Sequence, residues 1–497
     1  MSKMNNVEIY AFSTHYEIYN YKLGMFPKLE RLLSTWDDVN FKRNEYFYYD
    51  NDKHILYVPR GLNELMLEQC TEGCLVLGDR GPNQSQKMYF KMRYQPRDAV
   101  QKEAIRFLLG RNEYNYTSRS SQLILALIGG GGKTYCSTAA MSILGVKTMV
   151  ICHTSDLINQ WVDRLLEYTD LKESNIVKLS SSSDLMKYID QSPSIRRRQR
   201  NECVYIMSHA LIHNFITKEG FELTDELFNI LGIGLKIVDE FHRNFSNTLL
   251  IDYATNVKRT FYLSATPGRT DKNEDKVFQD SFASAYKFRR EASDFGRKAT
   301  TVVIYDIFKT RPIQIDLTRM FVAKKFSVYR YIDYELNNGK ILDRIEFWLD
   351  WLYNGKVSNG TIYIVSPTKE SCEIIRKMVQ RLYPEKKCCA HFSGNKVDNI
   401  DDYDIVCGTV KMLGTGTDIS NLRAMIVAEP VGSAVNADQL IHRLMRGKSD
   451  ETTYNIDLVD RAIPNVYNMY NRRKKIYAQF VKQNIVFKSY ETDKVVY

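Results

Sequence analysis

Residues 123–134, LILALIGGGGKT, contain the residue types that bind phosphate groups. Glycine has no side chain, so its backbone N–H can approach an anion closely, and the start of a helix adds a positive dipole end. Lys133 adds a charge suited to β- and γ-phosphates, and the Thr134 hydroxyl can hold Mg²⁺. The predicted loop comprises Gly129, Gly130, Gly131 and Gly132. A flexible glycine loop is the alternative, but an apolar run before it and a helical pattern after it favour a phosphate-binding loop.

An acidic pair follows in residues 235–242, LKIVDEFH, at the end of another apolar run. Parallel sheets present ligand-binding groups at the carboxyl ends of their strands. Asp239 is suited to contact Mg²⁺ that bridges nucleotide phosphates, and Glu240 to orient and deprotonate the attacking water. Taken alone, such a pair is more simply the solvated start of a helix. Its place downstream of the glycine loop, with a strand between, favours the catalytic interpretation.

Two series of short β-rich runs must position these groups. The first spans residues 122–265 and the second residues 361–459, on either side of a more helical, polar stretch at 311–359. The runs are QLILALI, KTMVICH, CVYIMS, LKIVDE and TFYLSA, then TIYIVS, KKCCAHF, YDIVCGT, AMIVAEP and TTYNIDLV. Alternation with helical patterns predicts an α/β fold with two tandem domains on parallel sheets.

The domain boundaries follow from these series. We expect a small N-terminal α+β domain at residues 1–92, with possible DNA-binding function and strand-like pieces YFYYD and HILYVP. The first parallel-sheet domain is expected at 93–305, and a linker with the second at 306–462. A basic and aromatic helical extension is expected at 463–497.

Composition excludes several classes of protein. The 497 residues are 44% hydrophobic and 26% charged, as in globular proteins of about three domains. No apolar run suits a signal peptide or a membrane span, so we expect a cytoplasmic protein without a membrane partner. Nine scattered cysteines lack zinc-site spacing and predict reduced thiols. The net charge of +10 supports a polyanionic partner only weakly.

Seven segments in order resemble the motifs of superfamily 2 helicases. Those resembling the Q motif and motifs I, Ia, II, III, V and VI are PRDAVQKEAIRFL (96–108), the glycine loop, VICHTSDLINQW (150–161), DEFH (239–242), LSATP (263–267), TVKMLGTGTDIS (409–420) and QLIHRLMR (439–446). The resemblance extends from residue 96 to about 460. It implies two RecA-like domains that hydrolyse ATP with Mg²⁺.

The resemblance assigns roles in the first domain. Gln101 would read the adenine edge, with Arg97 as a helper. Ser264 and Thr266 match the motif that links hydrolysis to domain movement, and His242 would join that link. A surface glutamine and a turn capped by hydroxyls are the alternative interpretations.

Further roles fall on the second domain. Arg443 and Arg446 match the motif VI arginines that reach across the cleft to the γ-phosphate as arginine fingers, and Gln439 would take part in coupling. Gly416 and Asp418 match nucleotide-sensing positions of motif V. The chain departs from the family at His442, where glycine is usual, and at residues 128–129, where Pro-Thr is common. Neither departure removes a charge needed for hydrolysis.

Hydroxyl and basic residues at strand ends are candidates for gripping a sugar-phosphate backbone independently of sequence. They are Thr154, Ser155, Ser208, His209, Ser366, Thr368, Thr409 and Lys411. Each could equally be an ordinary strand-end or helix-cap residue. Basic clusters add Arg196, Arg197, Arg198, Arg200, Lys287, Arg289, Arg290, Arg472, Arg473, Lys474 and Lys475, the last four interleaved with Tyr467, Tyr470 and Tyr477. That tail either binds nucleic acid or docks as a helix on the motor.

The N-terminal segment at 39–65 resembles that of phage UvsW-type branch-migration helicases, with a Pro-x-Gly-Leu turn at Pro59, Gly61 and Leu62. This implies a monomeric enzyme that remodels forks and four-way junctions with 3′ to 5′ polarity, in phage-type recombination, replication or repair, in the host cytoplasm if phage-encoded. Poxvirus-type transcription helicases share much of the pattern. Two alternatives stay open: an RNA or transcription-termination helicase, and a nucleic-acid-binding scaffold that does not hydrolyse ATP.

Overall fold

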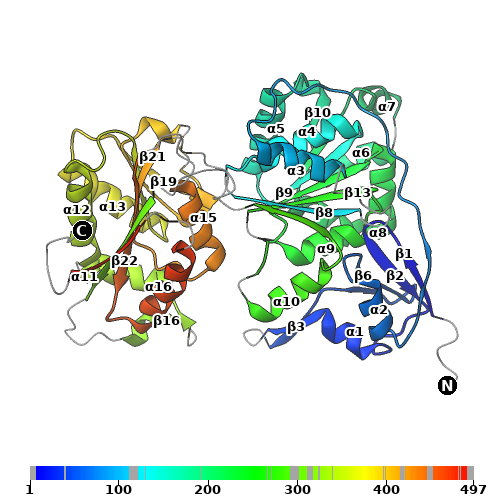
Figure 1. Ribbon diagram of the computed structural model, residues 1–497, viewed down its shortest axis with the longest axis horizontal. Helices are drawn as coiled ribbons and strands as arrows, with labels where there is room; N and C mark the ends of the chain where they lie inside the picture. The colour runs from blue at the N-terminus through cyan, green and yellow to red at the C-terminus, as the bar shows by residue number, and fades with distance from the viewer. Residues whose placement is uncertain are drawn as a thin grey trace. The chain divides into compact units, whose positions relative to one another are not determined.

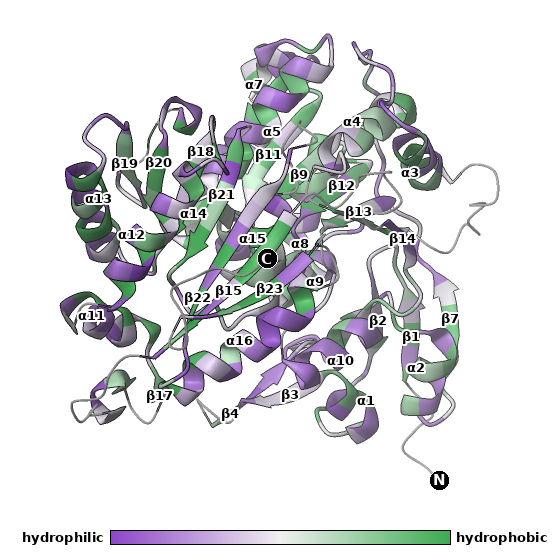
Figure 2. Ribbon diagram, turned by 60° about the vertical axis from the view of Figure 1, so that its left-hand side comes forward, coloured by the Kyte–Doolittle hydropathy of each residue, from purple (hydrophilic) through white to green (hydrophobic). Residues whose placement is uncertain are grey.

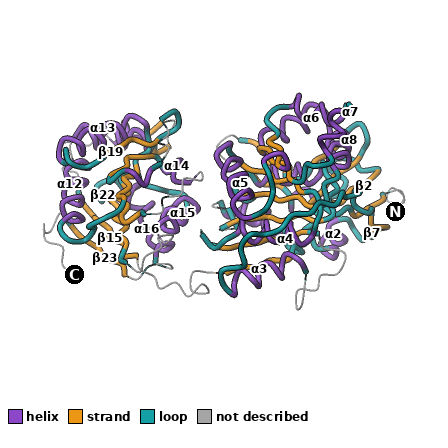
Figure 3. Tube along the Cα trace, turned by 90° about the horizontal axis from the view of Figure 1, so that it is seen from above, coloured by secondary structure: helices purple, strands orange, loops and turns teal. Residues whose placement is uncertain are grey.

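The computed structural model divides into two compact units, residues 1–295 and 296–497 (Figure 1). It describes residues 7–37, 41–110, 121–128, 130–190, 192–265, 267–269, 271–290, 301–309, 317–322, 325–338, 340–395, 397, 399–414, 419, 421–444, 451–478, 481 and 483–489. In each unit, helices lie on either side of the strands (Figure 3).

A seven-stranded, all-parallel sheet forms the centre of the first unit, in the order β10-β11-β9-β12-β13-β8-β14. The strands are β8 (Gln122–Leu127), β9 (Thr148–Cys152), β10 (Ile176–Lys178), β11 (Val204–Ser208), β12 (Leu235–Asp239), β13 (Arg259–Ser264) and β14 (Tyr286–Arg290). Every residue of β8, β9 and β12 is buried, as expected for strands covered on both faces. The five predicted runs are confirmed as strands.

Helices cover both faces of this sheet. They are α3 (Ala99–Leu109), α4 (Lys133–Leu144), α5 (Ser155–Tyr168), α6 (Ser182–Ile189), α7 (Pro193–Gln199), α8 (His209–Leu231), α9 (Phe245–Tyr253) and α10 (Lys272–Ser281). Strand side chains alternate between the two faces. Val150 of β9 packs into the core with α3, α4 and α5, whereas Met149 and Ile151 pack with α6 and α8.

A five-stranded mixed sheet, order β5-β6-β2-β1-β7, belongs to the same unit. Its elements and the neighbouring hairpin are β1 (Glu8–Ala11), β2 (His15–Tyr19), α1 (Pro27–Leu32), β3 (Ser34–Asp37), β4 (Lys42–Glu45), β5 (Tyr48–Asp50), β6 (Ile55–Pro59), α2 (Glu64–Cys70) and β7 (Val76–Asp79). Tyr16 and Leu56 share one core with Phe241 and Phe278 of the parallel-sheet part. This confirms the small α+β domain and shows that it docks on the parallel-sheet part of its unit.

The Pro-x-Gly-Leu turn lies at this docking contact. A Cβ at Gly61 would overlap the carbonyl oxygen of Ser281, and the backbone N–H of Ser284 donates to the Gly61 carbonyl at 2.8 Å. Only glycine permits so close an approach of two backbones. The glycine of the turn therefore has a packing role between the N-terminal domain and α10.

The second unit repeats the parallel architecture, in the order β19-β20-β18-β21-β22-β15-β23. Its strands are β15 (Thr301–Phe308), β18 (Thr361–Val365), β19 (Cys388–His391), β20 (Ile405–Gly408), β21 (Leu422–Val427), β22 (Thr453–Asp460) and β23 (Gln483–Lys488), with the short pair β16 (Phe321–Val322) and β17 (Lys325–Phe326). Its helices are α11 (Val328–Asn338), α12 (Lys340–Tyr353), α13 (Lys369–Leu382), α14 (Val410–Gly414), α15 (Ala434–Leu444) and α16 (Pro464–Tyr477). The strands of both sheets carry mostly hydrophobic residues (Figure 2).

Two segments lie differently from the expected boundaries. Strand β15 pairs along its length with β22, so the boundary expected between residues 305 and 306 falls inside a strand of the second sheet. The C-terminal segment contributes helix α16 and also strand β23, which pairs with β15 at the edge of that sheet. Among the described residues, no helix is both long and apolar enough to span a bilayer.

Candidate functional site

The glycine loop connects β8 to α4 as expected. Gly130 and Gly132 have φ angles of +70° and +93°, which favour glycine, and Gly132 is the residue before the first turn of α4. Lys133 opens the helix, and its Nζ donates to the Leu127 carbonyl at 3.1 Å. Gly131 and Thr134 lie in the same turn, whereas Gly129 lies outside the described residues. Backbone N–H groups at the start of a helix together with a lysine suit an anion, and the phosphate-binding role of this turn stays a prediction.

Gln101 lies directly against this loop. It is buried on α3, and its Oε1 accepts a hydrogen bond from the Arg97 backbone N–H at 2.8 Å. A Cβ on Gly132 would overlap the Gln101 side-chain nitrogen, Nε2. The Arg97 guanidinium donates to the Gly130 carbonyl at 3.4 Å. The structure thus brings together the Q-motif segment and the glycine loop, while the adenine-reading role stays a prediction.

Asp239 ends β12 and is fixed by two hydrogen bonds. The Trp161 indole N–H donates to Oδ2 at 2.9 Å, and the Glu240 backbone N–H donates to Oδ1 at 3.0 Å. Burial, with the nearby charge of Glu240, raises the pKa of Asp239 to about 6, although Trp161 and Lys133 act in the opposite direction. A cation beside this carboxylate would relieve the cost of its buried charge.

Trp161 has no role that could be predicted from the sequence alone. It lies on α5, the helix after the neighbouring strand β9, and only the fold brings its indole to Asp239. The indole N–H of a buried tryptophan needs a hydrogen-bond acceptor, and this requirement is the only hint in the sequence that Trp161 contacts a polar group.

Glu240 has a φ of +49°, an unusual backbone conformation for a residue other than glycine. Its carbonyl accepts a hydrogen bond from His153 Nε2 at 3.0 Å, which helps to hold that conformation. Burial by itself would raise the pKa of Glu240, but the positive charge of Lys133 and further cationic neighbours outweigh it and lower the pKa. Glu240 is therefore a carboxylate at neutral pH, the protonation state that a general base needs.

His242 connects Glu240 to the end of β13. Its Nδ1 lies 2.8 Å from the Ser264 hydroxyl and 3.4 Å from Glu240 Oε2. Burial lowers the pKa of His242 to about 4, so the ring is neutral at neutral pH and its contact with Glu240 is polar rather than an ion pair. Arg269, which no motif in the sequence singles out, donates a hydrogen bond to the His242 carbonyl and pairs with Glu274 at 2.8 Å. Thr266 lies outside the described residues.

A pair of histidines extends this network. His153 and His209 stack with ring centroids 4.3 Å apart and an interplanar angle of 4°. Burial lowers the pKa of both rings, so two neutral imidazoles pack behind Glu240. His209, a candidate for nucleic-acid contact, is buried in this stack.

The segment that carries the glycine loop and the acidic pair is similar to a known protein family. Residues 93–269 match a family model described as "Type III restriction enzyme, res subunit". This stretch runs from the Q-motif segment past the DEFH and SAT segments. This match, over about a third of the chain, supports a helicase-type enzyme of superfamily 2, a class of enzymes that uses ATP.

One relative and two solved structures show the extent of the similarity. "Transcript termination protein A18" of Yaba-like disease virus is 21% identical over 380 residues, which cover 73% of this chain and 72% of that protein. "ATP-dependent Type ISP restriction-modification enzyme LlaBIII bound to DNA" has a TM-score of 0.53 and 15% identity, over 80% of this chain and 32% of that one. T4 UvsW has a TM-score of 0.37 and 14% identity, over 97% and 99% of the two chains.

The residues that resemble motifs V and VI lie in the second unit. Arg443 is near the end of α15, and Gln439 lies on the same helix. Arg446, Gly416 and Asp418 lie outside the residues that the structure describes, as does the side chain of Gln439. Their roles stay predictions.

Several nucleic-acid candidates lie at the starts of helices. The hydroxyls of Thr154, Ser208 and Thr368 cap α5, α8 and α13. They accept hydrogen bonds from the backbone N–H groups of Leu157, Leu211 and Ser371, at 3.3, 3.1 and 3.0 Å. Ser155 is the first residue of α5, and Thr409 directly precedes α14. Helix capping is thus the observed role of the three hydroxyls.

The other two candidates for nucleic-acid contact are a buried serine and a lysine whose side chain is not among the described residues. Ser366 is fully buried, and its hydroxyl donates to Ser371 Oγ at 2.7 Å. The side chain of Lys411 is not among those described. Contact of any of these candidates with a nucleic-acid strand stays a prediction.

The basic C-terminal helix is docked on the second unit. Arg473 is 1% exposed, pairs with both carboxylate oxygens of Asp457 at 2.8 and 2.9 Å, and donates to the Val431 carbonyl at 2.8 Å. Tyr470 and Tyr477 are buried beside it. For these three residues, packing within the unit is therefore the observed role, and they present no surface to nucleic acid.

Two other basic clusters contain internal ion pairs. Arg198 pairs with Glu202 at 2.8 Å, and Arg290 of the edge strand β14 pairs with Glu103 at 2.8 Å. These arginines are partly neutralised within the first unit.

Proposed function

We propose that this superfamily 2 helicase is an ATP-hydrolysing translocase that remodels branched DNA. The observation that carries the enzymatic part is Glu240, a partly buried carboxylate whose pKa Lys133 lowers, next to Asp239 at the end of β12. A phosphate cradle and a deprotonated general base in one unit are what hydrolysis of a nucleoside triphosphate requires.

The residues of the first unit fit ATP with Mg²⁺. The positive φ of Gly132 and its close contact with Gln101 both favour glycine at the start of α4, and Lys133 would bind the β- and γ-phosphates. Thr134 and Asp239 would hold Mg²⁺, which supplies positive charge at the phosphates when bound. Glu240 would orient a water molecule and accept its proton, and His242 with Ser264 would transmit the change to β13.

Arg443 and Arg446 complete the proposed chemistry. A planar, permanently charged guanidinium stabilises the charge that develops on a transferring phosphoryl group. Arg446→Ala is expected to retain ATP binding and to lose hydrolysis by several orders of magnitude, about 10³-fold or more. Nucleotide binding and single-turnover hydrolysis measured on the same preparation check this expectation, and near-normal turnover would refute the assigned role.

DNA is the proposed track, and branched DNA the proposed structure. The resemblance of the N-terminal segment, with its Pro-x-Gly-Leu turn, to the UvsW type supports this choice. LlaBIII, which has a similar fold, is described as bound to DNA. We propose 3′ to 5′ movement along one strand, with sequence-independent backbone contacts.

An RNA-directed function is the second candidate, because the Yaba-like disease virus relative is described as a transcript termination protein. ATP hydrolysis by the purified protein should be measured with forks, four-way junctions, plain duplexes, single-stranded RNA and RNA hybrids. Stimulation mainly by forked or four-way DNA supports the proposal. Stimulation only by RNA would replace DNA with RNA as the track.

A scaffold without hydrolysis is the third candidate. Glu240→Gln keeps the shape of the side chain and removes the base, so turnover should be lost while DNA binding remains. If wild-type protein bound DNA but showed no turnover above that of Glu240→Gln with any nucleic acid, the scaffold would be the better description.

A further inference from the structure

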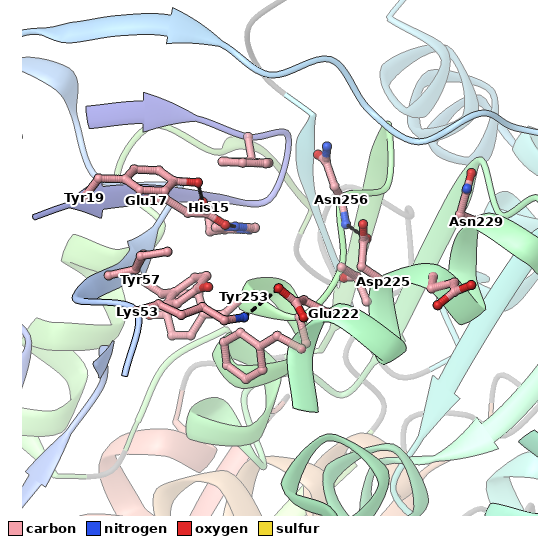
Figure 4. A pocket seen from close by; sticks show the side chains of 16 residues that line it. His15, Glu17, Tyr19, Lys53, Tyr57, Glu222, Asp225, Asn229, Tyr253 and Asn256 are labelled. Carbon is pink, nitrogen blue, oxygen red and sulfur yellow. Dashed lines mark hydrogen bonds and ion pairs between the residues drawn. The ribbon is translucent and has the colours of Figure 1, made fainter. Parts of the chain in front are cut away.

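A cavity of about 370 Å³ lies within the first unit (Figure 4), and its lining includes neither the glycine loop nor Asp239. Strands β2 and β6 of the N-terminal sheet form one side, and the second half of α8 with residues 253–256 forms the other. Its size falls in the range of small-molecule sites. A ligand in this cavity would therefore touch both the N-terminal domain and the parallel-sheet part.

The charges around the cavity are mostly negative. Four carboxylates line it, and the lining holds one lysine. The carboxylates are those of Glu17, Glu222, Asp225 and Glu226. Lys53 pairs with Glu222 at 2.6 Å at an exposed edge, so an ammonium group already occupies part of the rim. In a chain of net charge +10, this concave acidic surface attracts cations and repels the phosphates of nucleotides or DNA.

Aromatic rings form much of the wall. The Tyr57 ring lies 4.9 Å from Phe221 and 6.4 Å from Tyr253, centroid to centroid, and 5.7 Å from the His15 ring. Aromatic faces attract ammonium and guanidinium groups and pack against their alkyl stems. Carboxylates combined with such rings suit an organic cation better than a bare metal ion.

Two polar groups in the wall have unused binding capacity. Tyr57 is 5% exposed, yet no group of the described residues hydrogen-bonds its hydroxyl. Asp225 accepts hydrogen bonds from Asn83 Nδ2 and from the Asn256 backbone N–H, both at 2.7 Å and both at Oδ1. Burial raises the pKa of Asp225, as expected for a carboxylate without a close cationic partner. The Tyr57 hydroxyl is not one of the fully buried polar atoms, so it opens on the cavity and is available to a ligand group.

We propose that this cavity binds a small organic cation, an aliphatic amine or guanidinium, between the N-terminal sheet and α8. The ammonium or guanidinium lies among Asp225, Glu226 and the Tyr57 hydroxyl, and the alkyl part packs on the aromatic wall. The cation comes either from a free polyamine or from a lysine or arginine side chain of a peptide. The proposal is independent of the DNA-remodelling function.

The first test is calorimetric titration of the nucleic-acid-free full chain with spermidine at fixed ionic strength. We expect saturable binding at one site and a higher midpoint of thermal unfolding with ligand, because a ligand stabilises the state that binds it. Nα-acetyl-arginine amide, titrated in parallel, separates the two sources: tighter binding of spermidine indicates a free polyamine, and tighter binding of the amide a peptide side chain.

Variants decide whether the cavity is the site. Tyr57→Phe keeps the ring and removes only the hydroxyl, and Glu226→Gln alters an exposed side chain, so both should fold normally. Each should weaken binding by about 10-fold, equivalent to about 1.4 kcal/mol. Glu173→Gln, at an exposed position outside the cavity, is the matched control and should bind as the wild type does. Equal affinity in all four proteins, or no saturable binding of either ligand to the wild type, would overturn the proposal.

Discussion

Replacing Asp239 by asparagine should stabilise the nucleotide-free protein while it abolishes hydrolysis. Burial raises the pKa of Asp239 from 3.8 to about 6, so the ionised form is disfavoured in the folded state. A shift of about two pKa units corresponds to about 3 kcal/mol. Asparagine cannot accept hydrogen bonds from both Trp161 and the Glu240 N–H, which costs about 1–1.5 kcal/mol. The net gain at about pH 8 should therefore be about 1–2 kcal/mol.

The difference in stability between the wild type and Asp239→Asn should depend on pH. Because the folded-state pKa is raised, the folded protein takes up the proton more readily than the unfolded chain does. The stabilisation from this group is complete below about pH 4 and is lost as pH rises through about 6. The advantage of Asp239→Asn should consequently grow between about pH 4 and about pH 8.

Urea unfolding of the two proteins at several pH values, with EDTA and without nucleotide, measures this difference. Asp163→Asn, at an exposed position on α5, is the matched control and should show no such trend. A free energy of unfolding for Asp239→Asn that stays below the wild-type value at about pH 8, or a difference that does not change with pH, would refute the assigned cost of the buried charge.

Two further substitutions test contacts in the two units. Gly61→Ala places a methyl group against the Ser281 carbonyl oxygen, and should make the N-terminal domain more sensitive to limited proteolysis; an unchanged pattern would contradict the docking contact. Arg473→Ala leaves Asp457 buried without its partner, and should lower the free energy of unfolding by about 3–5 kcal/mol, whereas a change under about 1 kcal/mol would mean that the pair is not formed.

Much of the fold could be predicted because its signals are local. Apolar β-rich runs such as residues 122–127 and 361–365 became central strands, and a glycine loop before Lys133 became the strand-to-helix turn. Placement of Asp239 and Glu240 at a strand end also needed only the run before them. Strand β15 was not recognised as part of the second sheet, because its partners β22 and β23 lie about 150 or more residues further along the chain.

The supporting contacts of the site depend on long-range packing and could not be predicted. Trp161 reaches Asp239 only because β9 and β12 are neighbours in the sheet. The same neighbourhood brings His153 to the Glu240 carbonyl. Arg473 is one of four consecutive basic residues, and nothing local shows that it is the one paired inside the core. Charge patterns identify where a basic surface can be, but packing decides which side chains remain on it.

The central claim is that this chain couples ATP hydrolysis at Lys133 and Glu240 to movement on DNA. The most direct measurement is steady-state ATP hydrolysis by the wild type and by Glu240→Gln, each with and without a four-way DNA junction, at matched DNA occupancy. We predict strong stimulation of the wild type by the junction and, for Glu240→Gln, turnover reduced by about 10²-fold or more with unchanged DNA binding. Equal turnover in the two proteins, or wild-type hydrolysis that no DNA stimulates, would contradict the account.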